Sequence, residues 1–180
     1  MSTPTENPAF TALAAAHLDA AYNLARWLTR DASSAEDCVQ DAYLRAFRFF
    51  DGFRGGDGRA WLLKIVRNSC YTWLKQQKRD QQYVEYNDEF AGLAQQDDND
   101  ALHASNPQTQ LLREADVQQI EAALLRLPPE FREILVLREL QEMSYKQIAD
   151  IAGIAMGTVM SRLSRARKEL RRVLCEDGNP

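Results

Sequence analysis

Two stretches of the chain gather side chains that can contact nucleic acid. In the first, six residues share one helical face at spacings of three, one, three, four and three: Lys64, Arg67, Asn68, Tyr71, Lys75 and Lys78. Cations neutralise phosphates, an aromatic ring stacks on a base, and an amide bonds a base edge. This pattern is typical of a surface that binds a nucleic-acid strand, but taken alone it is explained at least as well by a solvated basic face.

The second stretch is GTVMSRLSRARKELRR, in which residues 161–172 hold six cations and one anion. In a recognition helix the N-terminal half reads base edges, and arginine can bond guanine bidentately. Four polar residues occupy that half: Ser161, Arg162, Ser164 and Arg165. The later Arg167, Lys168, Arg171 and Arg172 are expected to hold phosphates or to stay solvated. The alternative is a helical hairpin with a basic exposed side.

Catalytic and metal-binding patterns are missing from the sequence. It has no HExxH, no phosphate-binding glycine loop and no nucleophile–base pattern. Cys38, Cys70 and Cys175 are far apart, and only His17 and His103 could join them. We therefore expect reduced, structural cysteines, no metal site, no cofactor and no enzymatic activity.

Composition and charge point to a helical protein with separated charge blocks. Ala, Leu, Arg, Gln and Glu dominate, which favours an all-α fold. The formal net charge is −4, yet residues 59–79 hold six cations and no anion, whereas residues 80–116 hold nine anions and one cation. A binding partner interacts with these local electrostatic fields rather than with the net charge of the whole chain. The sequence shows no signal peptide and no apolar run near the roughly 20 residues of a membrane helix, so we expect a cytoplasmic protein.

Three helices are predicted in the first module, residues 8–80. One amphipathic helix covers residues 10–28. A second helix begins with Ser33 or Ser34 as its N-cap. Its core-facing stripe is predicted to be Val39, Ala42, Tyr43, Ala46 and Phe50. Four glycines in residues 52–58 then break the pattern. The third helix runs from about residue 59 to 79, with an apolar face of Leu62, Ile65, Val66, Ser69 and Trp73.

Residues 116–176 are predicted to form a second module containing a helix-turn-helix. Prolines at 128 and 129 suit the first turn of a helix. Ser144 and Gln147 are spaced as a capping box, and Gly153 suits the turn. The last helix has an inward seam of Val159, Leu163, Ala166, Leu170 and Val173. Between the modules, residues 81–115 lack periodicity and are predicted to be a flexible acidic linker.

The two modules together resemble the extracytoplasmic-function (ECF) sigma factors of bacterial RNA polymerase. AEDCVQDAYLRAF and RAWLLKIVRN are similar to parts of sigma region 2, and LPPEFREILVLRE followed by SYKQIA and GTVMSRL is similar to region 4. The resemblance covers residues 10–80 and 116–175, with the modules in the family's order. A helix-turn-helix alone is common, but these motifs in one chain are highly specific.

The resemblance implies three binding surfaces. One would dock on the clamp helices of the polymerase's largest subunit, through Asp37, Gln40, Asp41 and Arg45. A second would bind and melt the promoter −10 element, with a base flipped into a nearby pocket: Phe53, Arg54, Arg59, Lys64, Arg67, Asn68 and Tyr71. A third would read the −35 element: Ser161, Arg162, Ser164, Arg165, Arg167 and Lys168.

The same resemblance implies a dissociable promoter-specificity subunit of RNA polymerase, held by an anti-sigma factor. Its linker would pass near the RNA path and imitate nucleic acid. We expect the acidic first module and linker to suppress DNA binding by the free chain, while polymerase positions both basic faces together.

The chain departs from the family pattern at Met160, Thr72 and Gly58. Met160 stands where relatives often have a cation, and Thr72 stands where many have Asp. Gly58 replaces a bulkier residue, which affects the choice of the captured −10 base. Two other functions fit the residues less well: an autonomous helix-turn-helix regulator and a helical interaction protein that never touches DNA.

Overall fold

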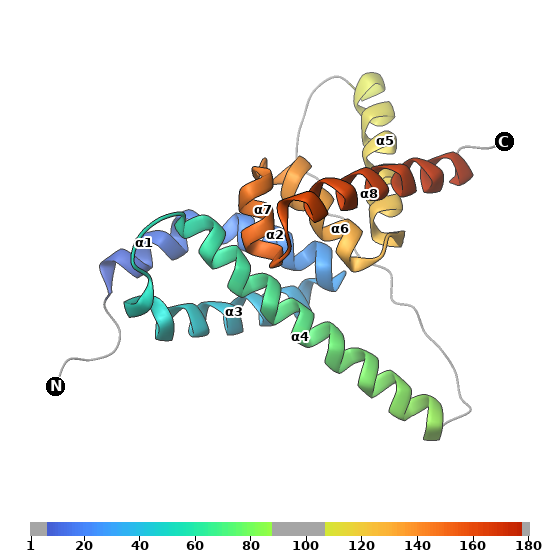
Figure 1. Ribbon diagram of the computed structural model, residues 1–180. Coiled ribbons are helices and arrows are strands. Elements are labelled where there is room, and N and C mark those ends of the chain that lie inside the picture. Colours follow the sequence, from blue (N-terminus) through green and yellow to red (C-terminus); the bar gives the residue numbers. More distant parts are fainter. Residues whose placement is uncertain (1–6, 88–106, 178–180) are drawn as a thin grey trace.

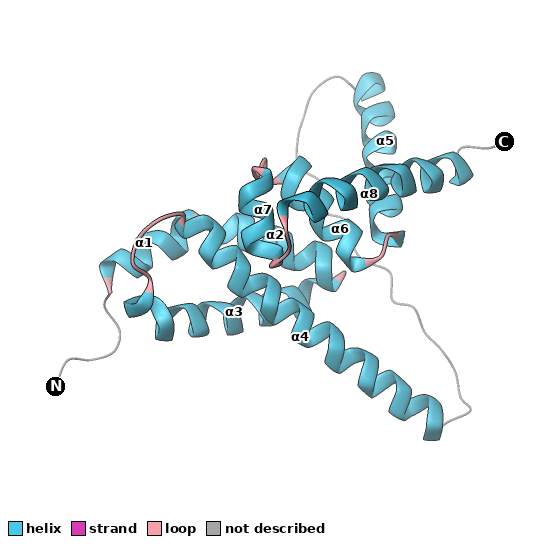
Figure 2. Cartoon of the chain, viewed as in Figure 1, coloured by secondary structure: helices cyan, strands magenta, loops and turns pink. Residues whose placement is uncertain are grey.

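The computed structural model is built from helices throughout the part of the chain that it describes, residues 7–87 and 107–177, with side chains in 7–82 and 116–176 (Figure 2). Short turns connect the helices and no strand occurs in these ranges. The predicted all-α fold is confirmed. None of the helices in this part of the chain combines the length and apolar character needed to cross a membrane.

The first module contains one helix more than the sequence indicated. Its elements are α1 (Pro8–Ala16), α2 (Leu18–Thr29), α3 (Ala32–Phe49), the 3-10 turn η1 (Phe50–Gly52) and α4 (Gly58–Asn87). The prediction of a single helix over residues 10–28 is wrong, because the backbone leaves the helical region at His17. The Ala14 carbonyl, which accepts the His17 amide at 3.4 Å, also accepts the Tyr43 hydroxyl at 2.9 Å, and this second bond ties α1 to α3.

Helix α3 begins earlier than predicted. Its N-cap is Asp31, not Ser33 or Ser34, and the Asp31 carboxylate accepts the Ser34 amide at 2.7 Å. Hydrogen bonds from Ser34 lower the pKa of Asp31 below its ordinary value. The inward stripe is as predicted: Val39, Ala42 and Ala46 are buried, and Tyr43 and Phe50 are half-buried.

Helix α4 is the longest element of the first module and continues past the predicted end near residue 79. Leu62, Val66 and Ser69 are buried on its inner face, as predicted, whereas its C-terminal half extends away from the other helices (Figure 1). The predicted linker, 81–115, therefore includes the end of α4 and the start of the next helix. Its central part, 88–106, lies outside the described residues.

The second module contains α5 (Pro107–Arg126), α6 (Pro129–Leu135), the π-helical turn η2 (Val136–Leu140), α7 (Tyr145–Ala152) and α8 (Met156–Asp177). Ser144 and Gln147 form the predicted capping box at the start of α7. Gly153 ends α7 at φ 67°, a left-handed conformation that glycine adopts without strain. Val159, Leu163 and Ala166 are buried along α8, so the predicted helix-turn-helix and its seam are confirmed.

The two modules pack against each other and share one hydrophobic core. Leu28 and Val66 of the first module belong to the same buried cluster as Leu127, Ile134 and Leu137 of the second. Helices α6 and α7 lie against α2 and α4 in this arrangement (Figure 1). The sequence predicted both modules but not their docking.

Arg132 of α6 fixes the contact between the modules. Its side chain is buried, at 2% exposure, and donates only to backbone carbonyls: Leu124, Leu125 and Leu127 of its own module, and Trp27 and Leu28 at the end of α2. The C-terminal end of a helix carries partial negative charge, so two helix ends together compensate one buried cation. Burial, with a smaller contribution from Arg30, lowers the pKa of Arg132 to about 10, and the guanidinium stays charged at neutral pH.

Candidate nucleic-acid interface

The basic face of α4 is divided between exposed and covered residues. Lys64, Asn68, Lys75 and Lys78 are exposed. Arg67 and Tyr71, which the sequence placed on the same face, are half-buried beneath α6 of the second module. The predicted −10 residues of α4 thus share a helical face, but only part of that face is open.

Glu133 of α6 holds both covered residues. Its carboxylate accepts Arg67 Nε and Nη2, and it accepts the Tyr71 hydroxyl at 2.8 Å. The Arg67 guanidinium also lies 4.2 Å from the centre of the Tyr71 ring, which is a cation–π distance. Burial alone would lower the pKa of Arg67, but the hydrogen bond and charge of Glu133 raise it above the ordinary value. Burial and Glu133 raise the pKa of Tyr71, so the phenol keeps its proton.

The loop between η1 and α4 places an aromatic pair beside a small cavity. Phe53 packs against Phe50 and Trp61, with ring centres 6.0 and 4.9 Å away. Gly55 and Gly56 both have positive φ, which lets the chain turn back into α4. The cavity, about 290 Å³, is lined by the end of η1, this loop, the first turns of α4 and Asp150 of α7: Gly52, Phe53, Arg54, Gly55, Asp57, Ala60, Trp61, Lys64 and Asp150.

The second module also reaches the start of α4. Arg59, predicted to contact −10 DNA, is half-buried and donates to Gln141 Oε1 at 2.7 Å. Asp57 caps α4 by accepting the Ala60 amide at 3.0 Å, and Gln147 of α7 donates to the same carboxylate. The Gln147 hydrogen bond lowers the pKa of Asp57. Arg54 and Lys64 remain exposed at this end.

Gly58 and Thr72, two of the departures from the family pattern, have local structural roles. A Cβ at Gly58 would stand 2.4 Å from Leu13 Cδ1, so a larger residue would push that side chain of α1 aside. Thr72 is exposed and its hydroxyl donates to the Asn68 carbonyl one turn earlier, at 2.9 Å.

Helix α8 presents an open polar face. Met160, the third departure, is 53% exposed and lies beside Ser161, Ser164, Arg165 and Lys168, all of them exposed. The helical phase predicted for α8 therefore agrees with the structure. Of the remaining predicted −35 residues, Arg162 is half-buried and Arg167 is exposed.

Arg167 is held by Glu139 in an ion pair at the module's own surface. Arg167 Nη2 lies 2.6 Å from Glu139 Oε1, and this hydrogen bond raises the pKa of the guanidinium. Arg172 similarly bonds Glu169 and Glu176. Among the predicted −35 residues, the exposed cations without such a pairing in the described residues are Arg165 and Lys168, which are therefore the better candidates for DNA contact.

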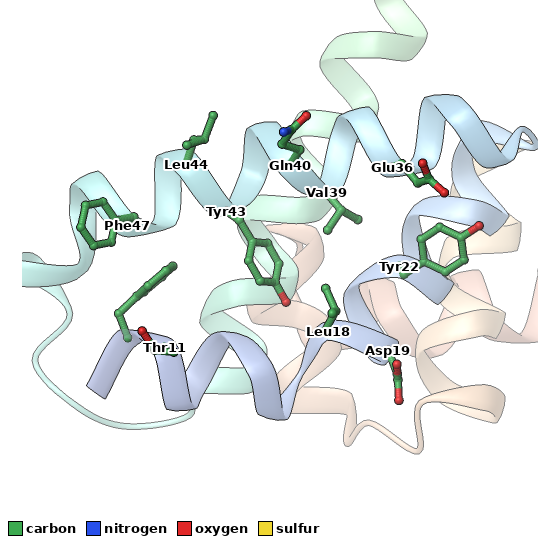
Figure 3. A pocket seen from close by; sticks show the side chains of 11 residues that line it. Thr11, Leu18, Asp19, Tyr22, Glu36, Val39, Gln40, Tyr43, Leu44 and Phe47 are labelled. Atoms are coloured by element: carbon green, nitrogen blue, oxygen red, sulfur yellow. The ribbon is translucent and has the colours of Figure 1, made fainter. Parts of the chain in front are cut away.

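An apolar groove lies on the other side of the first module, between α3 and the α1–α2 pair (Figure 3). It has a volume of about 870 Å³ and is lined by Phe10, Thr11, Leu18, Asp19, Tyr22, Glu36, Val39, Gln40, Tyr43, Leu44 and Phe47. Leu18 is 47% exposed and Leu44 is 57% exposed, which is unusual for side chains of this kind on adjacent helices.

Three of the four predicted polymerase contacts are exposed on α3, the helix that forms one wall of this groove. Gln40 lines it, and Asp37 and Arg45 are exposed on the same helix. Asp41 is half-buried, where it accepts the Ser69 hydroxyl at 3.0 Å and pairs with Arg45 at 2.9 Å. The groove was not predicted from the sequence. Leu44, an apolar residue outside the inward stripe of α3, could have indicated an exposed apolar surface there.

Two buried charges of α6 were missed as well. Arg132 and Glu133 interrupt the apolar run EFREILVL. Charges in such a segment must be buried with partners, because an unpaired buried charge is very costly. That reasoning could have marked both residues as contacts to another part of the chain.

Two docked helical modules, one of them a helix-turn-helix with a basic outer face, have the architecture of a DNA-binding protein. Residues 13–80 match the family described as Sigma-70 region 2, and residues 117–170 match Sigma-70, region 4. The ECF RNA polymerase sigma factor EcfG of Rhodopseudomonas palustris is 34% identical over 154 residues, which is 84% of this chain and 77% of that protein. The chain belongs to the family of ECF RNA polymerase sigma factors and is a transcription initiation factor.

Two other relatives extend the comparison over nearly the whole chain. The ECF RNA polymerase sigma factor SigE of Mycolicibacterium smegmatis is 30% identical over 177 residues, 96% of this chain and 64% of that protein. The chain thus spans less than two thirds of that relative's length. The sigma factor RpoE of Bartonella quintana, solved in a co-crystal with the anti-sigma factor NepR, matches with a TM-score of 0.76 and 30% identity, over 93% of this chain and 98% of that one.

Proposed function

We propose that this sigma factor binds core RNA polymerase and directs it to promoters by reading −35 DNA with α8 and melting −10 DNA with α4 and the preceding loop. The observation that carries the proposal is the outer face of α8, where Ser161, Ser164, Arg165 and Lys168 are all exposed on the second helix of a helix-turn-helix. The domains are residues 8–80 and 116–176. In this proposal the chain acts in the cytoplasm by binding polymerase and promoter DNA, and it catalyses no reaction itself.

An in vitro transcription assay with core polymerase tests the −35 role. Arg165→Ala removes an exposed guanidinium that can bond a guanine, an interaction worth about 1–3 kcal/mol, so initiation at a −35-dependent promoter should fall by about 5- to 150-fold. The matched control is Arg172→Ala on the same helix, because that guanidinium is already bonded to Glu169 and Glu176. Equal losses in both variants would contradict the assignment, and no promoter-dependent initiation by the wild-type chain would refute the function.

We further propose that the apolar groove of α3 contributes to polymerase docking. The groove combines exposed leucines with Gln40, Asp19 and Glu36, and Asp37 and Arg45 are exposed on the same helix, α3. This suits a partner helix with mixed apolar and charged residues. Leu44→Glu should weaken binding to core polymerase by at least about tenfold without unfolding the chain. Val117→Glu, at an apolar site of α5 that is 52% exposed, is the control and should bind normally.

Control by an anti-sigma protein is the last part of the proposal. It is supported by the likeness to the RpoE structure, whose partner is an anti-sigma factor. A protein captured with this chain from uninduced cells should, once purified, stop transcription by the reconstituted holoenzyme. Capture without inhibition would count against this control.

A further inference from the structure

We propose that Met156 and Met160, the methionine pair, determine part of the −35 specificity of this chain by contacting the C5-methyl groups of thymines in the major groove. This inference rests on the function proposed above and adds to it the kind of base pair that α8 prefers at this point. Its basis is the exposure of both side chains, 52% and 53%, at the start of the second helix of the helix-turn-helix.

The methionine pair forms one apolar surface on α8. The two residues are four positions apart, so their side chains are neighbours on the same side of the helix. Val159, between them in sequence, is fully buried and marks the side of α8 that packs on the core. One exposed apolar side chain needs no explanation, but two adjacent ones on a helix whose outer face is otherwise polar indicate a contact.

The position of the methionine pair identifies DNA as the occupant of this surface. In a recognition helix, the N-terminal residues meet the base edges, and Met156 is the first residue of α8. The exposed cations Arg165 and Lys168 follow one to three turns later, which suits the phosphates beside the same groove. The methionine pair is therefore continuous with the basic face of α8 and lies at the end of that face that enters the groove.

The backbone near the methionine pair can approach the bases closely. Gly157 is exposed, and a Cβ built on it would meet no other atom within 4 Å. Ser161 follows one turn later on the same outer face, and it is also exposed and short. Small side chains at these two positions allow the long thioether side chains on either side to reach the floor of the groove.

The chemistry of methionine selects thymine among the four bases. The base edges in the major groove present hydrogen-bond donors and acceptors, and the single apolar group among them is the thymine C5-methyl. A methionine side chain donates no hydrogen bond and its sulfur is a weak acceptor, so it cannot satisfy the polar groups of a G·C pair. Its flexible thioether can instead pack on a methyl group. We therefore expect T·A pairs where the methionine pair meets the −35 element.

The test measures initiation by core polymerase with the full-length chain at limiting holoenzyme. The template is a promoter selected from a library randomised around the −35 element. Each thymine of the selected element is then replaced in turn by deoxyuridine, which lacks only the C5-methyl. At one or two thymines this replacement should lower initiation about fourfold, the effect of removing one buried methyl group from an apolar contact. A selected element in which no deoxyuridine lowers initiation would overturn the proposal.

Variants assign the effect to the methionine pair. Met156→Gln/Met160→Gln should initiate equally from thymine and deoxyuridine templates, because glutamine makes no apolar contact with the methyl group. Val117→Gln, at an equally exposed apolar residue of α5, is the control and should keep the fourfold difference. If the methionine variant keeps that difference, or is weakened while keeping it because the pair contacts a protein, the proposal is wrong. If wild type selects no −35 sequence, the proposed function itself fails.

Discussion

Met160→Arg tests whether the outer face of α8 contacts DNA. Met160 is 53% exposed beside Arg165, so the new guanidinium needs no burial and meets no obstacle. If it reaches one phosphate, the slope of log affinity against log salt should steepen by about 0.9. Raising the salt from about 0.05 to about 0.2 M should then weaken the variant about 3.5-fold more than wild type.

The assay is a salt titration of binding to −35 duplex, by fluorescence anisotropy with the full-length chain. Met160→Gln separates size from charge and should keep the wild-type slope. Val117→Arg adds the same charge at an equally exposed site of α5 and should change the slope little. If Met160→Arg changes neither affinity nor slope, α8 does not present this face to DNA and the proposed −35 assignment is wrong.

Two further predictions concern stability. Arg132→Leu should lower the free energy of unfolding by about 3–5 kcal/mol in urea titrations, because the carbonyls around a buried cation lose their donors. The control Arg48→Leu, at an exposed site, should change the free energy of unfolding little. Equal free energies of unfolding for the two variants would show that the Arg132 contacts do not form in solution. Asp31→Ala should cost about 1 kcal/mol as a lost N-cap. Because the pKa of Asp31 is lowered on folding, this difference should be complete above the ordinary value of 3.8 and be lost as the pH falls through the lowered pKa of the folded state. A difference that persists in stronger acid would contradict the cap.

The sequence predicted those features that depend on neighbouring residues. The capping box of Ser144 and Gln147 and the left-handed turn at Gly153 are local, so their spacing was enough to find them. The seam of α8 and the exposed position of Met160 followed from helical periodicity alone. The functional class, an ECF sigma factor, was predicted from the family motifs, because caps, turns and helical periodicity do not indicate a function.

The break at His17 and the docking of the modules were not predictable in this way. The break is fixed by contacts of α1 with α3, such as the Tyr43 hydroxyl on Ala14, 29 residues away. The Arg67–Glu133 pair joins residues 66 positions apart. Periodicity could show that Glu133 lies in an apolar segment, but not which cation it meets. The sequence predicts that the acidic linker and the first module suppress DNA binding, whereas the structure shows the Glu133 carboxylate of α6 bonded to two of the predicted −10 contacts, Arg67 and Tyr71.

Arg132 and Glu133 are adjacent, yet separating the modules affects them differently. Arg132 keeps the carbonyls of Leu124, Leu125 and Leu127, all within its own module. Glu133 loses both of its partners and is left as an anion amid newly exposed apolar surface. We therefore expect a chain whose modules have separated to be short-lived in the cell, because such an exposed surface promotes proteolysis and aggregation. A surplus of this factor over available polymerase would then survive mainly with its two modules docked.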